Sequence, residues 1–199
     1  MSMQETEPSA DHSPVFEFKA RNMLSAGFIA ALFIYGIIGA SKPEVFWILS
    51  NTDLILHEMG HLVIGIFGIE VLTVLGGTIG QLFFPIAFAV YFIRRRQYYN
   101  SSVMVFWIVQ NLFDIAIYMA DARALKLPLF SFGSGDGGID HDWNYLLYRW
   151  GILVYDTQIA GGIKIIGYML FVVFLLSGLF FALQSYKTDD TEAVEFIEN

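Results

Sequence analysis

The chain has 199 residues, of which 56% are hydrophobic, 17% aromatic and only 15% charged. Because an average soluble domain carries about 25% charged residues, this composition indicates an integral membrane protein. The chain has no cysteine and a formal net charge of −8, which excludes disulfides and thiolate metal sites and argues against a nucleic-acid partner.

Apolar runs along the chain predict an all-α integral membrane protein with about five transmembrane helices. The predicted spans cover residues 23–40, 45–68, 82–93, 102–120 and 159–183. A further helix is expected over residues 143–155, lying at the membrane interface with Trp and Tyr side chains as anchors.

The second predicted span contains the segment His57-Glu58-Met59-Gly60-His61. On a helix, His57 and His61 leave the same face one turn apart, the spacing at which two imidazoles bind one zinc ion (Zn2+). Glu58 is the candidate general base for a water activated by the metal. Asp53 lies one turn before His57. Its carboxylate either fixes the tautomer of that imidazole or is simply solvated near the end of the helix. Ionisable side chains at bilayer depth are costly and are kept mainly for function.

A glycine-rich stretch follows this motif. Residues 71–75 form a short segment enriched in β-branched side chains, and residues 76–81 contain three glycines. This pattern predicts a strand-like or re-entrant element with non-helical backbone. A strand edge there would bind an extended peptide substrate by β-addition, and a tight turn before the third span is the alternative.

A catalytic zinc ion needs a third protein ligand. The fourth span carries a polar stripe of Asn111, Asp114, Tyr118 and Asp121, spaced by three, four and three residues on an otherwise apolar helix. Asp114 is the first choice for the third ligand because it lies near the middle of its span, as His57 does. A polar contact between two helices is the alternative role for Asp114.

The polar connection over residues 121–143 offers further ligand candidates. His141, flanked by Asp140 and Asp142, is suited to bind the metal directly or to orient a ligand. Asp142 is equally suited to cap the helix that follows. Glycines in the connection would let it fold over the site as a lid.

This layout resembles the site-2 protease family of intramembrane zinc metalloproteases, as a short and divergent member, over about residues 45–123. The matching features are the histidine motif in an early membrane helix, the glycine-rich stretch, and Asn111 and Asp114 two spans later. The resemblance implies that Asp114 is a zinc ligand and that Asn111 helps to position the substrate. The family's Asn-x-x-Pro…Leu-Asp-Gly signature is absent. The nearest counterpart of the Asp-Gly pair that ends this signature is Asp121-Ala122-Arg123, so Asp121 is an alternative to Asp114 as the third zinc ligand.

We therefore predict a protease that hydrolyses peptide bonds of membrane-embedded or membrane-proximal substrates, with the lipid bilayer and a membrane protein as its partners. A zinc hydrolase acting on a lipid or small amide, and a non-catalytic zinc-binding scaffold, are the alternatives. The predicted metallohydrolase domain covers residues 23–185, between disordered acidic tails over residues 1–22 and 186–199. Basic residues beside the spans give conflicting orientations in the membrane.

Overall fold

The computed structural model of the chain describes residues 14–42, 47–127 and 141–184. Within these residues the chain forms six α-helices and one 3₁₀ turn, and no strand. The elements are α1 (Pro14–Ser41), α2 (Trp47–Gly65), α3 (Glu70–Arg94), α4 (Tyr98–Ala120), α5 (Asp142–Arg149), η2 (Leu153–Tyr155) and α6 (Asp156–Leu183). The predicted all-α class is confirmed for this part of the chain.

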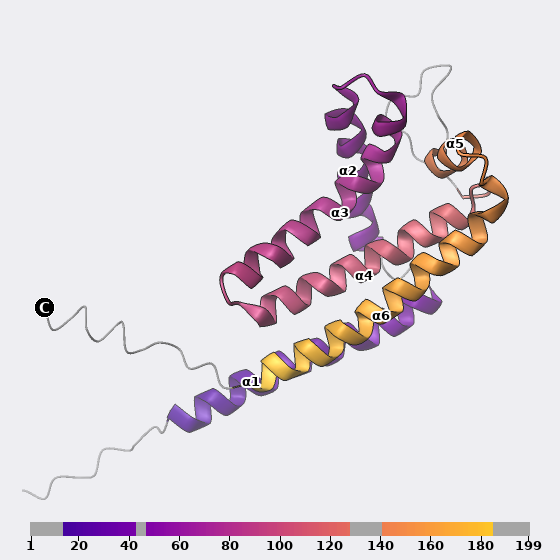
Figure 1. Cartoon of the computed structure of the whole chain (residues 1–199). Coiled ribbons are helices and arrows are strands. Elements are labelled where there is room, and N and C mark those ends of the chain that lie inside the picture. The colour runs from indigo at the N-terminus through magenta and orange to yellow at the C-terminus, as the bar shows by residue number, and fades with distance from the viewer. Residues whose placement is uncertain (1–13, 43–46, 128–140, 185–199) are drawn as a thin grey trace, which may run out of the picture.

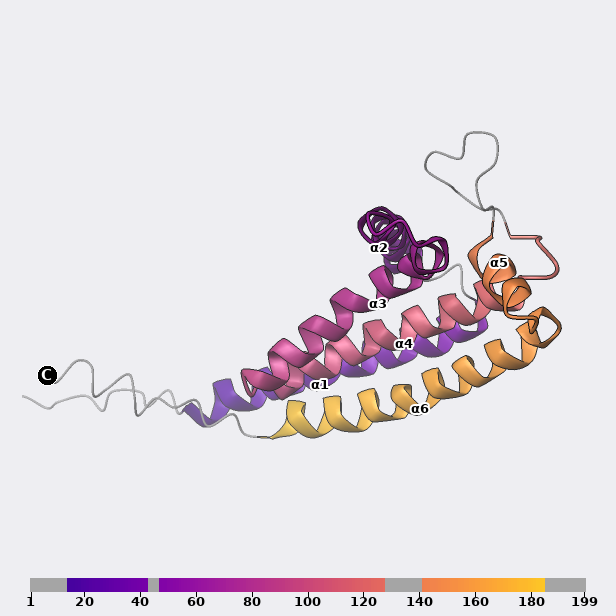
Figure 2. The same ribbon diagram turned by 45° about the horizontal axis from the view of Figure 1, so that its top comes forward.

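The long helices form a bundle around α4. Helix α4 packs against α3 on one side and against α6 on the other, and α1 runs along α6 (Figures 1 and 2). Helix α2 packs on α3, and the short α5 lies at the end of the bundle where α4 ends and α6 begins. This arrangement brings α2 and α5, which are far apart in the sequence, to the same end of the molecule.

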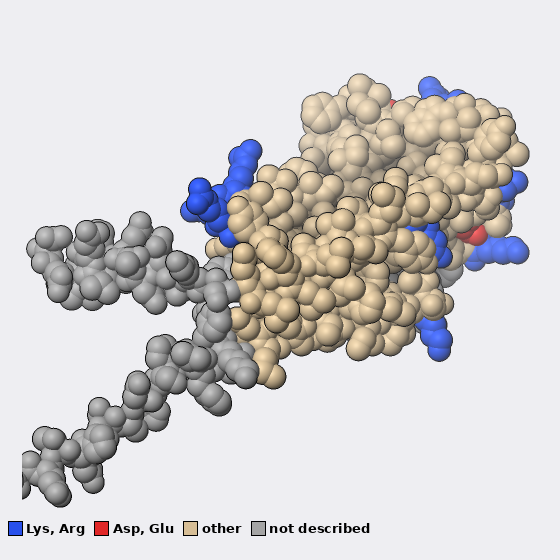
Figure 3. All heavy atoms as spheres, turned by 60° about the horizontal axis from the view of Figure 1, so that its bottom comes forward, with Lys and Arg blue, Asp and Glu red and all other residues tan. Residues whose placement is uncertain are grey.

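Four segments are long and apolar enough to cross a membrane: Asn22–Ser41, Glu70–Arg94, Tyr98–Ala120 and Leu153–Leu183. Figure 3 shows Lys and Arg side chains gathered toward the two ends of the molecule, with a wide surface of uncharged side chains between them. An apolar belt between charged ends is the pattern of a membrane protein. Helix α2 is not among the four segments, since polar residues interrupt its apolar sequence, and the prediction of five spans is not confirmed.

The glycine-rich segment over residues 71–81 lies inside α3, so the predicted strand-like or re-entrant element is not confirmed. Close packing explains the glycines instead. A Cβ atom on Gly60 of α2 would overlap the carbonyl oxygen of Gly76, and a Cβ atom on Gly76 would lie 2.6 Å from the carbonyl oxygen of Gly60. Gly80, one turn after Gly76 on the same face, makes a similar approach to α2. Small residues at this spacing let two helix backbones touch.

Other boundaries also differ from the sequence-based prediction. Helix α1 begins at Pro14, so the last part of the tail predicted as disordered over residues 1–22 is helical. The predicted interfacial helix over residues 143–155 is divided into α5 and η2. Residues 1–13 and 185–199 of the predicted tails, and the glycines of the predicted lid, lie outside the described residues.

Candidate metal site

Three side chains from two distant parts of the chain meet at the end of the bundle: His57 and His61 of α2, and Asp142 of α5. Oδ2 of Asp142 lies 2.8 Å from Nε2 of His57 and 3.1 Å from Nε2 of His61. Candidate ligand atoms of the three residues all lie within 4.8 Å of one another. His57 and Asp142 are buried and His61 is half-buried. This group could hold a metal ion.

Hydrogen bonds on the far side of each imidazole determine where its proton lies. Nδ1 of His61 is 2.8 Å from the carbonyl oxygen of Thr73, which can only accept, so this Nδ1 carries a proton and donates it. Nδ1 of His57 is 2.8 Å from Oε1 of Gln81 and donates to it in the same way. In the neutral rings, both Nε2 lone pairs therefore point toward the Asp142 carboxylate.

Two nitrogen lone pairs and a carboxylate oxygen repel one another unless positive charge lies between them. Protonating one ring would pair that ring with the carboxylate but leave the other Nε2 lone pair facing it. Protonating both rings would place two like charges next to each other, since the ring centroids of His57 and His61 are only 4.7 Å apart. A single metal cation satisfies all three atoms at once. Two imidazoles and one carboxylate are a ligand set typical of catalytic zinc, which keeps its fourth position open.

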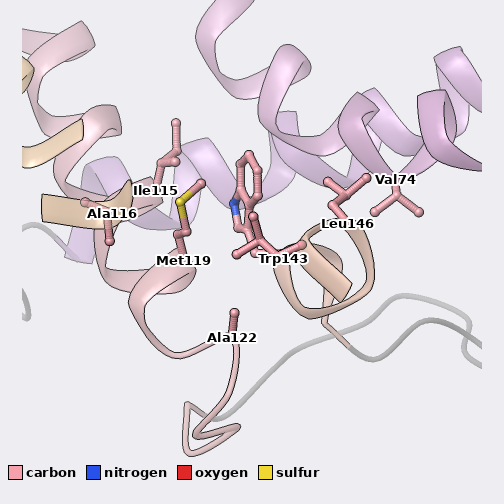
Figure 4. Close-up of a cluster of buried hydrophobic side chains, with 9 residues drawn as sticks. Val74, Ile115, Ala116, Met119, Ala122, Trp143 and Leu146 are labelled. Carbon is pink, nitrogen blue, oxygen red and sulfur yellow. The ribbon is translucent and has the colours of Figure 1, made fainter. Parts of the chain in front are cut away.

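Helix α5 holds Asp142 over the histidines through its apolar side chains. Trp143 and Leu146 are 8% and 1% exposed, and they belong to a buried cluster that also contains Val74 of α3 and Met119 of α4. Figure 4 shows Trp143 beside Met119 and Leu146 directed toward Val74. Each large apolar side chain buried in this way contributes about 1.5–3 kcal/mol, which fixes the start of α5 against both helices.

The first residues of α5 have separate tasks. His141 is the N-cap, and its Nδ1 accepts a hydrogen bond of 3.2 Å from the backbone N–H of Asn144. Asp142 is therefore not the cap, and its carboxylate faces the histidines. Its backbone N–H donates to the hydroxyl of Tyr118 at 3.0 Å. Burial alone would raise the pKa of the Asp142 carboxyl, but contact with the His57 and His61 imidazoles holds that pKa below its usual value, as an ionised ligand requires.

Asp114, the first choice for the third ligand, is not part of this group. Its Oδ2 accepts hydrogen bonds from Ser50 Oγ at 2.7 Å and from Gln110 Nε2 at 2.5 Å. Ser50 precedes His57 by seven residues, which is about 10 Å along a helix. The middle of α4 is therefore level with the beginning of α2 and not with its histidines. Asp142, one of the alternatives for the third ligand, is the carboxylate that the structure brings to the histidines.

The remaining candidates also lie away from the two Nε2 atoms. Asn111 is fully buried and donates to the carbonyl oxygen of Trp107 at 3.1 Å, in the neighbourhood of Asp114. Asp53 accepts a hydrogen bond from Trp107 Nε1 at 2.8 Å. The carboxylate of Asp121 accepts backbone hydrogen bonds from the loop after α4, and His141 Nε2 lies 3.8 Å from it.

Glu58 is half-buried on α2 next to His57. Its charge is close enough to act on His61 and on Tyr118, two of the residues that surround the site. The carboxylate predicted to act as general base is therefore near the candidate ligands without being one of them.

Sequence reasoning did not identify the residues that orient the imidazoles, Gln81 and the carbonyl of Thr73. Gln81 is a polar side chain in the apolar α3, one turn after Gly77 on the same face. A Cβ atom on Gly77 would overlap the His57 ring. In the sequence, a glycine followed one turn later by a glutamine in an apolar segment was the pattern from which the contact between α3 and the histidines could have been predicted.

Comparison of the chain with protein-family models, with curated proteins and with solved structures finds no match. The resemblance to the site-2 protease family therefore stays a prediction from the residues quoted above.

Proposed function

We propose that the protein is a multi-pass membrane zinc protease that hydrolyses peptide bonds of membrane-embedded or membrane-proximal substrates. The observation that carries this proposal is the meeting of His57 Nε2, His61 Nε2 and Asp142 Oδ2, with both Nδ1 protons directed to acceptors on α3. Such outer hydrogen bonds are typical of metal-binding histidines, because they fix the tautomer and the ring orientation.

The donor atoms favour zinc over other common metals. Imidazole nitrogen and carboxylate oxygen suit Zn2+, and the absence of cysteine from the chain excludes thiolate-dependent sites. When bound, zinc supplies Lewis-acid activation of a water molecule and of the carbonyl group under attack.

The protein's own groups then divide the remaining work. Glu58, beside His57 but outside the ligand group, accepts the proton of the attacking water and passes it to the leaving amine. Asp142 contributes one negative charge that offsets the charge of the metal. The Tyr118 hydroxyl, which accepts the N–H of Asp142, acts as a positioning group for this ligand.

A hydrophobic surface next to His61 supports a substrate that arrives through the bilayer. Leu62, Ile66 and Phe67 are 74%, 82% and 72% exposed, and they follow His61 along α2 and the turn after it. Side chains of this kind favour a membrane-spanning peptide over a water-soluble one. The same surface would accept a lipid, which makes a lipid amide or ester the competing substrate.

The test is to reconstitute the zinc-loaded protein in liposomes together with single-span membrane peptides, and to analyse peptides and lipids by mass spectrometry. We expect peptide fragments with the wild-type protein and a loss of about 10²–10⁴-fold in rate for Glu58→Gln, the usual contribution of a general base. The variant should retain its zinc. Lipid products without peptide fragments would identify the competing activity, and equal cleavage by both proteins would contradict the proposed mechanism.

A further inference from the structure

A second polar cluster lies between α2 and α4. It contains two carboxylates, Asp53, which is 2% exposed, and Asp114, which is half-buried. Asp53 Oδ1 accepts a hydrogen bond from Trp107 Nε1 at 2.8 Å, while Asp114 Oδ2 accepts from Ser50 and Gln110. The two carboxylates are close enough for their charges to act on each other.

The hydrogen-bond donors to these carboxylates that the described residues supply are all neutral. The ion pairs of the described residues involve neither Asp53 nor Asp114. Two neighbouring carboxylates among apolar helices are unfavourable unless a positive charge compensates them. Among the described residues, no Lys, Arg or His side chain forms an ion pair that compensates the two carboxylates.

Three oxygen atoms in the cluster are buried without a hydrogen-bond partner: Asp53 Oδ2, Gln110 Oε1 and Asn111 Oδ1. Gln110 and Asn111 are both 0% exposed, and their side-chain N–H groups face the Asp53 carboxylate as hydrogen-bond donors. All three atoms are acceptors, so each of them calls for a hydrogen-bond donor or a cation. Buried polar atoms are normally paired, and an exception indicates a missing water or ion.

We propose that this cluster binds a divalent, oxygen-seeking cation of the Ca2+ class. Carboxylates and amide carbonyls are the ligands that such cations prefer, and the cluster has no imidazole or sulfur that would favour zinc. Two carboxylates match a charge of +2. The cation ties α2, through Asp53, to Asn111 and Asp114 of α4, and it is independent of the metal at His57 and His61.

The experiment titrates Ca2+ into the full-length, zinc-loaded protein in detergent and measures binding by isothermal calorimetry. We expect one Ca2+ per chain in the wild type, and binding weaker by about tenfold or more in Asp53→Asn and Asp114→Asn, because the affinity of such sites follows the number of charged ligands. Glu70→Gln, which changes an exposed carboxylate at the start of α3, is the matched control and should bind as the wild type does.

Helix content by circular dichroism and zinc content show whether the two variants remain folded, since none of the three substitutions touches His57, His61 or Asp142. Folded variants that bind Ca2+ as the wild type does would overturn the proposal. A wild-type protein that takes up no Ca2+ would overturn it too, and would mean that a proton neutralises the cluster.

Discussion

Helix α2 contributes to two polar clusters that differ in their donor atoms. At its middle, His57 and His61 present nitrogen lone pairs to one carboxylate, and each ring is oriented by an acceptor on α3. Near its beginning, Asp53 joins Asp114 and two amide side chains, so that oxygen atoms predominate. The comparison shows that a buried carboxylate does not by itself identify a zinc ligand. Whether a buried carboxylate can bind zinc depends on the donor atoms next to it and on the helices that carry those atoms.

The largest expected effect separates Asp142 and Asp114, two of the carboxylates considered for the role of third ligand. Asp142→Ala should lower zinc affinity by more than about 100-fold, since the loss of a ligand exceeds the 10–100-fold effect of an outer-shell partner. Asp114→Ala should leave zinc affinity nearly unchanged, because Asp114 contacts Ser50 and Gln110 instead of the histidines. Competition with a chelator of known affinity measures both. Equal losses in the two variants would remove the distinction between the clusters.

Gln81→Leu should lower zinc affinity by about 10–100-fold, because Gln81 accepts the Nδ1 proton of His57 and so directs Nε2 to the metal. The control is Gln158→Leu, which changes an exposed glutamine near the start of α6. The same chelator competition applies. Unchanged affinity in Gln81→Leu would show that His57 does not need this orientation.

Gly77→Ala should displace the His57 ring, because the added Cβ atom would overlap it. Overpacking of this kind costs about 1–3 kcal/mol, and we expect a lower unfolding temperature together with weaker zinc binding. Gly161→Ala is the matched control: its Cβ atom would meet no atom within 4 Å, and alanine is the better helix former. If both variants unfold at the same temperature, the close contact between α3 and His57 is not present.

Tyr118→Phe should have the smallest effect. It removes the acceptor of the Asp142 N–H, a hydrogen bond of 3.0 Å, and the loss of about 1 kcal/mol corresponds to about fivefold in zinc affinity. Tyr99→Phe removes a comparable hydroxyl that donates to the carbonyl of Ser25, and zinc affinity should not change. A loss as large as that of Asp142→Ala would mean that Tyr118 contacts the metal itself.

Local sequence patterns were sufficient for the all-α class and for the pairing of the two histidines on one helix face. The i, i+4 spacing of His57 and His61 needs only helix geometry, and long apolar runs identify spans by composition. The glycines at 76, 77 and 80 were misinterpreted, because glycine lowers helix propensity locally whereas its effect here is to let α2 and α3 touch. Tertiary contact decides between these two outcomes, and the sequence does not show it.

The carboxylate that meets the two histidines was harder to predict for a related reason. Asp142 lies 81 residues after His61 in the sequence, in a short helix whose position depends on Trp143 and Leu146 packing against α3 and α4. Matching Asp114 to His57 by its depth in a span assumed that α2 and α4 run level with each other. The hydrogen bond from Ser50 to Asp114 shows that they do not.

The most direct test of the central claim is zinc-edge X-ray absorption spectroscopy of the purified protein. Two imidazole nitrogens and one carboxylate oxygen at about 2.0–2.2 Å are predicted for the wild type and for Asp114→Ala, with the oxygen contribution altered in Asp142→Asn. A protein that binds no metal, or a spectrum unchanged in Asp142→Asn, would contradict the account.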